Sequence, residues 1–123
     1  MTSVTEVLLR LLSATYAIVI ALIFCSSGEA APADWQPPAF WLQQAACVHG
    51  HEGSWRAATG NGYEGGLQFL RSTWVSVGGS VASNGRWASV VSSREQLYRA
   101  WLVWRRDGGS WREWGTAGAC GLT

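Results

Sequence analysis

Glu52 is the residue of this chain whose type and surroundings best suit acid catalysis. It lies in the stretch CVHGHEGSWRAATGNGYEGGLQFLRSTW, residues 47–74, between a predicted helix and a Gly-rich loop. Cleavage of a glycosidic bond needs a carboxylic acid that is still protonated near neutral pH and can protonate the leaving oxygen. Trp55, three residues further on, could form the apolar wall that raises a carboxyl pKa by desolvating the charged form. Spacing alone favours the simpler interpretation of an exposed Glu at a helix end.

Glu64 is the candidate for a second carboxylate at the same site. Hydrolases of the two-carboxylate type place the second group about 5–9 Å from the acid. Because Glu64 follows Glu52 by twelve residues and lies on a predicted hairpin, such a distance is possible. A solvated hairpin residue is the interpretation that we favour for Glu64.

His49 and His51 form a His-x-His-Glu string just before the Gly-rich loop. A bound metal ion needs at least a third well-placed ligand. The chain has two His in all, and its later cysteines are expected to pair with each other. We therefore expect no metal and no cofactor, and we expect His51 to line the cleft or to cap the helix.

Length and charge restrict the classes of protein to which this chain can belong. Its 123 residues suffice for one domain, and a hydrophobic share of 48% is enough for a core. The formal net charge is +1, and a nucleic-acid partner would need a clustered basic patch that the sequence does not suggest. We expect a monomer without a nucleic-acid partner.

Residues 1–30 have the pattern of a secretory signal peptide. Arg10 ends a short n-region, residues 11–24 are mostly apolar, and Gly28 and Ala30 place small residues at the −3 and −1 positions of a cleavage site. A membrane anchor is the alternative, but a spanning helix needs about 20 apolar residues and this run is shorter. We expect cleavage near Ala30, and then an extended lead over residues 31–38.

The part that remains keeps two cysteines, Cys47 and Cys120. In a secreted chain such a pair most simply forms a disulfide, and two free thiols are the less favoured alternative. Closing so long a loop contributes roughly 4 kcal/mol in the chain-entropy model. A domain this small is marginal without such a covalent link.

The elements that must position these residues are mostly helices. Apolar residues recur at helical spacing over residues 39–49, where Gly50 is the expected C-cap or hinge. A longer helix is predicted over residues 93–106, with Ser92 or Ser93 as its N-cap. A short helix over residues 72–77 is expected to be capped by Ser72, a single turn is expected over 110–114, and a coil over 115–123.

A small irregular hairpin is expected within residues 54–69, because Asn61-Gly62 is a strong hairpin signal. Leu67 and Phe69 should face the core, and Gln68 should point to the opposite side.

All nine Trp lie after residue 30, in a domain too small to bury every one. Trp101 and Trp104 follow helical spacing and are our choices for the core. Tyr63 and Trp74 flank the Gly-rich loop and are the better candidates for a platform on which sugar rings stack.

Several short motifs occur together in this chain. They are TGNGYEGGLQF at residues 59–69, STW at 72–74, GG at 78–79, SREQ at 93–96 and a Trp-rich end that closes with Ala119-Cys120. Together they resemble the catalytic domain of resuscitation-promoting factors, which are secreted actinobacterial peptidoglycan-cleaving proteins related to lysozymes. The resemblance covers roughly residues 35–121. It implies an α+β, small lysozyme-like domain over residues 39–123, mainly helical with one short β-hairpin and one disulfide.

The resemblance also implies roles for individual residues. Glu52 matches the family's catalytic acid, and Cys47 and Cys120 match its disulfide pair. The positions that match the glycan groove are Thr59, Tyr63, Gln68 and Trp74. The implied partner is the peptidoglycan glycan strand at the cell wall, cut at the β-1,4 bond between N-acetylmuramic acid and N-acetylglucosamine, with other cell-wall hydrolases as further expected partners. In related lytic enzymes the muramic C6 hydroxyl attacks and leaves a 1,6-anhydro end, which needs neither a second carboxylate nor a metal.

Two positions depart from the family pattern. Many members have Cys directly before Glu, whereas four residues separate Cys47 from Glu52 here. Four residues are about one helical turn, so Glu52 stays on nearly the same side if the helix continues through Gly50. The other departure is Glu64, where the family usually has Tyr, and this carboxylate could alter the charge of the groove or offer a base for water.

A muralytic enzyme is the leading hypothesis from the sequence. A binding or signalling module that kept the groove and lost turnover is the second, and a structural secreted disulfide domain is the third.

Overall fold

The computed structural model describes residues 30–122, so the predicted signal peptide lies outside the described residues. The helices are α2 (Ala39–Glu52), α3 (Arg71–Ser76) and α4 (Ser93–Arg106). A 3₁₀ turn η1 (Ala88–Val90) lies between α3 and α4, and a 3₁₀ turn η2 (Gly115–Cys120) follows α4. One antiparallel pair, β1 (Tyr63–Glu64) and β2 (Phe69–Leu70), completes the fold. No helix within residues 30–122 combines the length and the apolar character that crossing a membrane requires. The expected α+β class, mainly helical with one hairpin, is confirmed.

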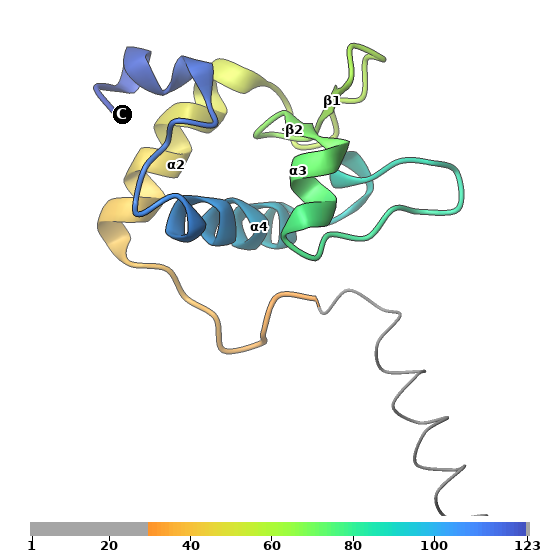
Figure 1. Ribbon diagram of the computed structural model, residues 1–123, viewed down its shortest axis with the longest axis horizontal. Coiled ribbons are helices and arrows are strands. Elements are labelled where there is room, and N and C mark those ends of the chain that lie inside the picture. The colour runs from red at the N-terminus through yellow and green to blue at the C-terminus, as the bar shows by residue number, and fades with distance from the viewer. Residues whose placement is uncertain (1–29, 123) are drawn as a thin grey trace, which may run out of the picture.

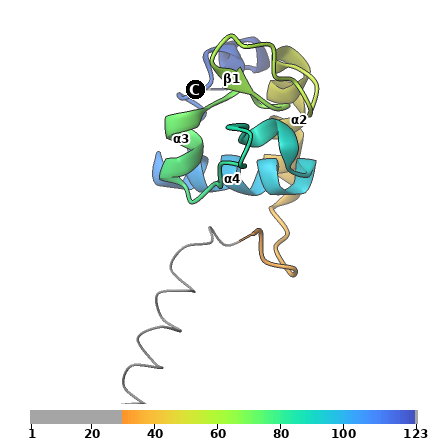
Figure 2. The ribbon, with the colours of Figure 1, turned by 90° about the vertical axis from the view of Figure 1, so that its right-hand side faces the viewer.

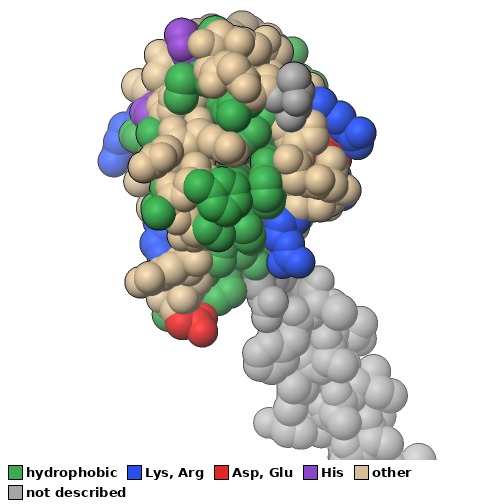
Figure 3. Space-filling view, turned by 90° about the vertical axis from the view of Figure 1, so that its left-hand side faces the viewer, with side chains coloured by type: hydrophobic (Ala, Val, Ile, Leu, Met, Phe, Trp, Pro, Cys, Tyr) green, Lys and Arg blue, Asp and Glu red, His purple; other side chains and the backbone are tan. Residues whose placement is uncertain are grey.

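Helix α4 forms the base of the domain, with α2 and α3 standing towards its two ends (Figure 1). The hairpin lies above α4 and between the other two helices, as the perpendicular view shows (Figure 2). Helix α2 turns Trp41, Ala45 and Val48 inwards, a spacing that places all three on one helical face. Hydrophobic side chains also gather on the outer face seen in Figure 3, with Arg side chains at its margin.

The core is built largely from Trp side chains. Trp41 stacks on Trp111 with ring centroids 5.4 Å apart, and Trp111 meets Trp114 edge-on at 5.1 Å. Trp101 and Trp104, which we expected in the core, are only partly buried. They stack on each other at the margin of the core. The fully or nearly fully buried Trp are Trp41, Trp74, Trp111 and Trp114.

Helix α4 has the predicted bounds. The Ser92 side chain accepts a hydrogen bond from the backbone N–H of Glu95, which identifies Ser92 as the N-cap. At the other end the Gly109 N–H returns to the Trp104 carbonyl at 2.8 Å, and Gly109 adopts a φ of 83°. A left-handed glycine after the last turn is a common way to end a helix.

Three other expectations about the elements need correction. Helix α2 does not stop at Gly50 but runs on to Glu52, because Gly50 does not adopt the positive φ of a left-handed cap. Helix α3 begins at Arg71, and Leu70 rather than Ser72 holds the N-cap position. Residues 115–120 form a 3₁₀ helix instead of a coil, whereas residues 110–114 form no helix.

The hairpin exists, but its turn is not at Asn61-Gly62. Tyr63 pairs with Leu70 and Glu64 with Phe69, so residues 65–68 connect the strands and Asn61 precedes them. The Gln68 N–H closes this connection on the Gly65 carbonyl at 3.1 Å. Leu67 and Phe69 are buried as expected.

Cys47 and Cys120 form the expected disulfide, with Cα atoms 6.0 Å apart. The bond ties α2 to η2 across 73 positions of the sequence. The C-terminal segment is thereby held beside the helix that carries Glu52.

The lead over residues 31–38 packs back on α4. The Trp35 ring meets Tyr98 edge-on with centroids 5.2 Å apart. The Arg94 guanidinium donates to the carbonyls of Pro32 at 2.5 Å and Trp35 at 3.0 Å. The lead is therefore a docked part of the domain.

Candidate active site

Glu52 is the last residue of α2, and its side chain is partly buried. The Thr116 hydroxyl donates a hydrogen bond to its Oε1 at 2.5 Å. Thr116 belongs to η2, the segment that the disulfide ties to α2. The continuation of the helix past Gly50 thus delivers Glu52 to a polar partner that comes from the far end of the chain.

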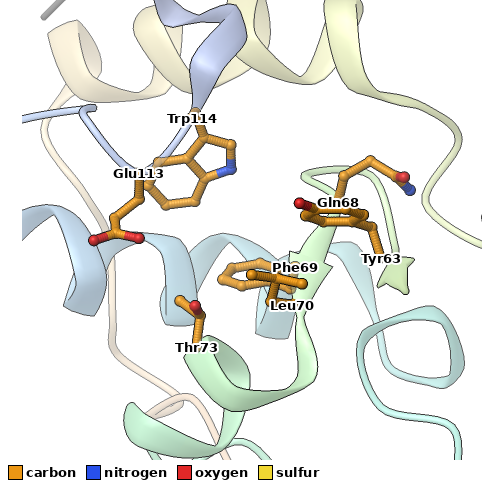
Figure 4. Close-up of a pocket in the computed structure, with 7 residues that line it drawn as sticks. All are labelled: Tyr63, Gln68, Phe69, Leu70, Thr73, Glu113 and Trp114. Atoms are coloured by element: carbon orange, nitrogen blue, oxygen red, sulfur yellow. The ribbon is translucent and has the colours of Figure 1, made fainter. Parts of the chain in front are cut away.

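The Glu52 side chain lines a hollow between the hairpin and the C-terminal segment. Its other lining residues are Asn61, Tyr63, Gln68, Glu113, Trp114, Gly115 and Thr116. A second hollow continues it towards α3, lined by Tyr63, Gln68, Phe69, Leu70, Thr73, Glu113 and Trp114. Because the two share four residues, we describe them together as the groove. In Figure 4, Tyr63 and Gln68 lie on one side of it and Trp114 and Glu113 on the other, with Thr73 below.

Gln68, which lines the groove, has an unusual backbone conformation. Its φ of 48° is the one positive value among the non-glycine residues of positions 30–122. Such a conformation costs about 1 kcal/mol or more in a residue with a side chain and often marks a functional position. The Gln68 amide donates to the Gly65 carbonyl at 3.0 Å and accepts from the Asn61 amide at 3.4 Å. Its strained backbone and these bonds fix the direction of a polar side chain that lines the groove.

Glu64 does not line the groove. Its carboxylate is 1% exposed, so the expectation of a solvated hairpin residue is wrong, as is the alternative of a second carboxylate at the site. Oε2 accepts from the Trp87 N–H at 2.9 Å and from the Ser89 hydroxyl at 2.8 Å, and Oε1 accepts from Arg86 at 3.2 Å. Burial by itself raises the pKa of Glu64, but these donors outweigh it and lower the pKa below its usual value. Glu64 therefore fastens the 86–89 loop to the hairpin.

Trp55 is not the apolar wall beside Glu52 that spacing suggested. Its ring stacks on His49 with centroids 4.0 Å apart, and it lies outside the residues that line the groove. His49 Nδ1 in turn lies 2.6 Å from the Gly66 carbonyl. A Cβ at Gly66 would come within 2.4 Å of the Trp55 ring, so only glycine permits this approach. The His49–Trp55 pair braces the hairpin against α2, and the aromatic neighbours in the groove are Tyr63 and Trp114.

His51 is exposed and does not line the groove, so the first of its two expected roles is wrong. It lies in the last turn of α2, and its role as a helix cap stays a prediction. Its ring lies beside Cys47 and Cys120, with the three possible ligand atoms within 4.8 Å of one another. The two sulfur atoms are bonded to each other, so they offer no thiolate to a metal ion.

The four residues expected to bind glycan separate into two pairs. Tyr63 and Gln68 line the groove together with Glu52. Trp74 is wrong as a stacking platform, because it is fully buried and donates its indole N–H to the Ser80 carbonyl at 2.8 Å. Thr59 is exposed outside the residues that line the groove, and its contact with glycan stays a prediction.

Sequence reasoning missed most of the wall opposite the hairpin. Glu113, Trp114 and Thr116 come from the C-terminal segment. They are far from Glu52 in the sequence, and no motif there links them to it. The Trp114 indole N–H donates to the Leu67 carbonyl at 2.8 Å, which fixes this wall to the hairpin. The predicted disulfide was the available signal, since it brings residues just before Cys120 to the helix of Glu52.

The sequence model of a family described as transglycosylase-like domain matches residues 22–117. The chain belongs to this transglycosylase-like family. It is similar to resuscitation-promoting factor Rpf2 of Corynebacterium glutamicum, with 40% identity over 80 residues that cover 65% of this chain and 19% of that protein. It is also similar to resuscitation-promoting factor Rpf of Micrococcus luteus, with 32% identity over 117 residues that cover 93% of this chain and 48% of that protein.

Resuscitation-promoting factor RpfA of Mycobacterium tuberculosis shares 46% identity over 56 residues, which are 46% of this chain and 12% of that protein. This member of the transglycosylase-like family thus spans about half the length, or less, of these relatives. The resemblance to the catalytic domain of resuscitation-promoting factors, drawn from the motifs, is confirmed.

Proposed function

We propose that the protein is a secreted enzyme that cleaves peptidoglycan at the β-1,4 bond between N-acetylmuramic acid and N-acetylglucosamine, with Glu52 as the general acid. The observation that carries this proposal is the carboxylate of Glu52 at the end of α2, opening into a groove lined by aromatic and amide side chains. Tyr63, which is 42% exposed, offers a ring face to sugars. Gln68 and Asn61 offer amide groups to hydroxyl and N-acetyl substituents. The family and the similar resuscitation-promoting factors support this substrate.

In the proposed reaction, protonated Glu52 donates its proton to the glycosidic oxygen as the bond to the anomeric carbon breaks. The resulting carboxylate then accepts a proton from the nucleophile that attacks the same carbon. If the muramic C6 hydroxyl attacks, a 1,6-anhydro end forms and Glu52 returns to its protonated form without another carboxylate. If water attacks, the end is hydrated.

Burial of Glu64 removes it as the base for water, and Glu113 is the other carboxylate that lines the groove. The one-carboxylate route is therefore the simpler of the two. We expect the enzyme to act as a monomer at the cell wall after cleavage near Ala30, together with other cell-wall hydrolases.

The test is digestion of purified peptidoglycan with the disulfide-bonded protein and with Glu52→Gln, followed by mass spectrometry of the soluble fragments. We expect fragments from the wild type, at least 100-fold fewer from Glu52→Gln, and ends lighter by one water for the anhydro product. Glu113→Gln is the matched control, since it removes the same charge from the same groove. An equal loss in both variants would contradict Glu52 as the single acid, because either the charge of the groove or a second role for Glu113 would then explain the effect. Binding without fragments in the wild type would favour the binding-module hypothesis instead.

A further inference from the structure

Thr116 makes the hydrogen bond that sets the orientation of the Glu52 carboxyl group. Its hydroxyl lies 2.5 Å from Oε1, a short distance for a hydrogen bond between two oxygens. Within residues 30–122 it is the one side chain found to hydrogen-bond to Glu52. Oε1 therefore accepts a hydrogen bond from Thr116, and no side chain of the same described residues is found to bond to Oε2.

The hydroxyl of Thr116 is held in place from both sides. Just before it, Trp114 is buried and bonded through its indole N–H to the Leu67 carbonyl. Just after it, Ala117 is buried, and Cys120 closes the disulfide to α2. A hydroxyl on a segment fixed at both ends can hold a carboxyl group in one orientation at little cost in entropy.

We propose that Thr116 is a positioning residue that acts through Glu52, on the basis that Glu52 is the acid of the proposed function. By donating to Oε1, Thr116 leaves Oε2 as the oxygen that carries the transferable proton towards the glycan in the groove. As Oε2 releases its proton to the glycosidic oxygen, negative charge develops on the carboxylate, and the Thr116 hydroxyl stabilises that charge. A donor already in place for developing charge lowers the barrier.

The proposal predicts a slower reaction in Thr116→Val, which keeps the shape of the side chain and removes the hydroxyl. The initial rate at low substrate, proportional to kcat/KM, should fall about tenfold or more because a fixed donor to the developing charge is lost. Because this donor acts on charge that develops in the transition state, the loss should fall on kcat, and binding of peptidoglycan should stay within about twofold of wild type. Thr116→Ser, which restores the hydroxyl, should recover the rate to within about threefold of wild type.

The experiment measures muropeptide release over a range of peptidoglycan concentrations, and binding to the same peptidoglycan, for the wild type, Thr116→Val, Thr116→Ser and Glu52→Gln, with thermal unfolding of each. A loss in Thr116→Val that lies in binding and not in kcat, or a Ser variant as slow as the Val variant, would overturn the proposal. If the Val variant does not fold, the same comparison is made with Thr116→Ala against Thr116→Ser. Activity in Glu52→Gln would refute the proposed function itself, whereas an inactive Glu52→Gln beside a fully active Thr116→Val would refute the positioning role alone.

Discussion

Replacing Glu64 by Gln should destabilise the domain and leave Glu52, the proposed catalytic acid, in place. Gln keeps the size of the side chain, and its amide oxygen can occupy the place of Oε2 and still accept from the Trp87 N–H and the Ser89 hydroxyl. Those bonds then lose the negative charge that strengthened them. The amide NH₂ would face the Arg86 guanidinium, so that one ion pair becomes two opposed donors.

The expected cost follows from these contacts. Arg86 is 44% exposed, so its ion pair is worth at most about 1 kcal/mol. The weakening of buried, charge-assisted bonds to Trp87 and Ser89 adds about 1 kcal/mol or more. A total of about 2 kcal/mol corresponds to a fall in Tm of roughly 8–16 °C for a domain of this size.

The effect should also depend on pH. The folded-state pKa of Glu64 is lowered from 4.5, so its charge stabilises the fold above that pH, and this contribution is lost as the pH falls through the folded pKa. The gap in Tm between the wild type and Glu64→Gln should therefore narrow in acid. Thermal unfolding followed by circular dichroism at neutral and acid pH measures both quantities.

Glu113→Gln is the control for this measurement, because Glu113 is exposed and its loss should change Tm by less than about 3 °C. Equal Tm values for the wild type and Glu64→Gln at neutral pH would refute the structural role of Glu64. A folded Glu64→Gln that releases no muropeptides would refute the conclusion that Glu64 lies outside the chemistry.

Two further perturbations test the frame around the groove. Reduction of the Cys47–Cys120 bond should lower the free energy of unfolding by about 4 kcal/mol. Urea unfolding with and without reductant measures this difference, and an unchanged midpoint would contradict the prediction. Gln96 is fully buried, accepts from the Gly66 N–H at 2.8 Å and donates to the Trp55 carbonyl at 2.9 Å. Gln96→Leu should therefore lower the free energy of unfolding by roughly 3 kcal/mol. Gln43 is exposed, so Gln43→Leu should change it little and serves as the control. Equal urea midpoints for the two variants would show that the Gln96 bonds do not support the hairpin.

Features that depend on neighbours along the chain could be predicted from the amino-acid sequence. Helical spacing and the Ser92 cap fixed α4 at residues 93–106, because both signals act within a few residues. The pair Cys47 and Cys120 was predicted because removal of the predicted signal peptide, which contains Cys25, leaves two cysteines and a single pairing. Glu52 emerged from its motif, although spacing could not show that α2 continues through Gly50 to reach it.

Contacts between side chains that are distant in the sequence are evident in the folded structure alone. The sequence gives no sign that Glu64 is buried under residues 86–89, that Trp74 belongs to the core, or that Trp55 stacks on His49 and not beside Glu52. Thr116 is 64 positions from Glu52, and its hydroxyl reaches the carboxylate because a disulfide and a buried Trp hold η2 against α2. The environment of a charge depends on such long-range packing, which local patterns do not encode.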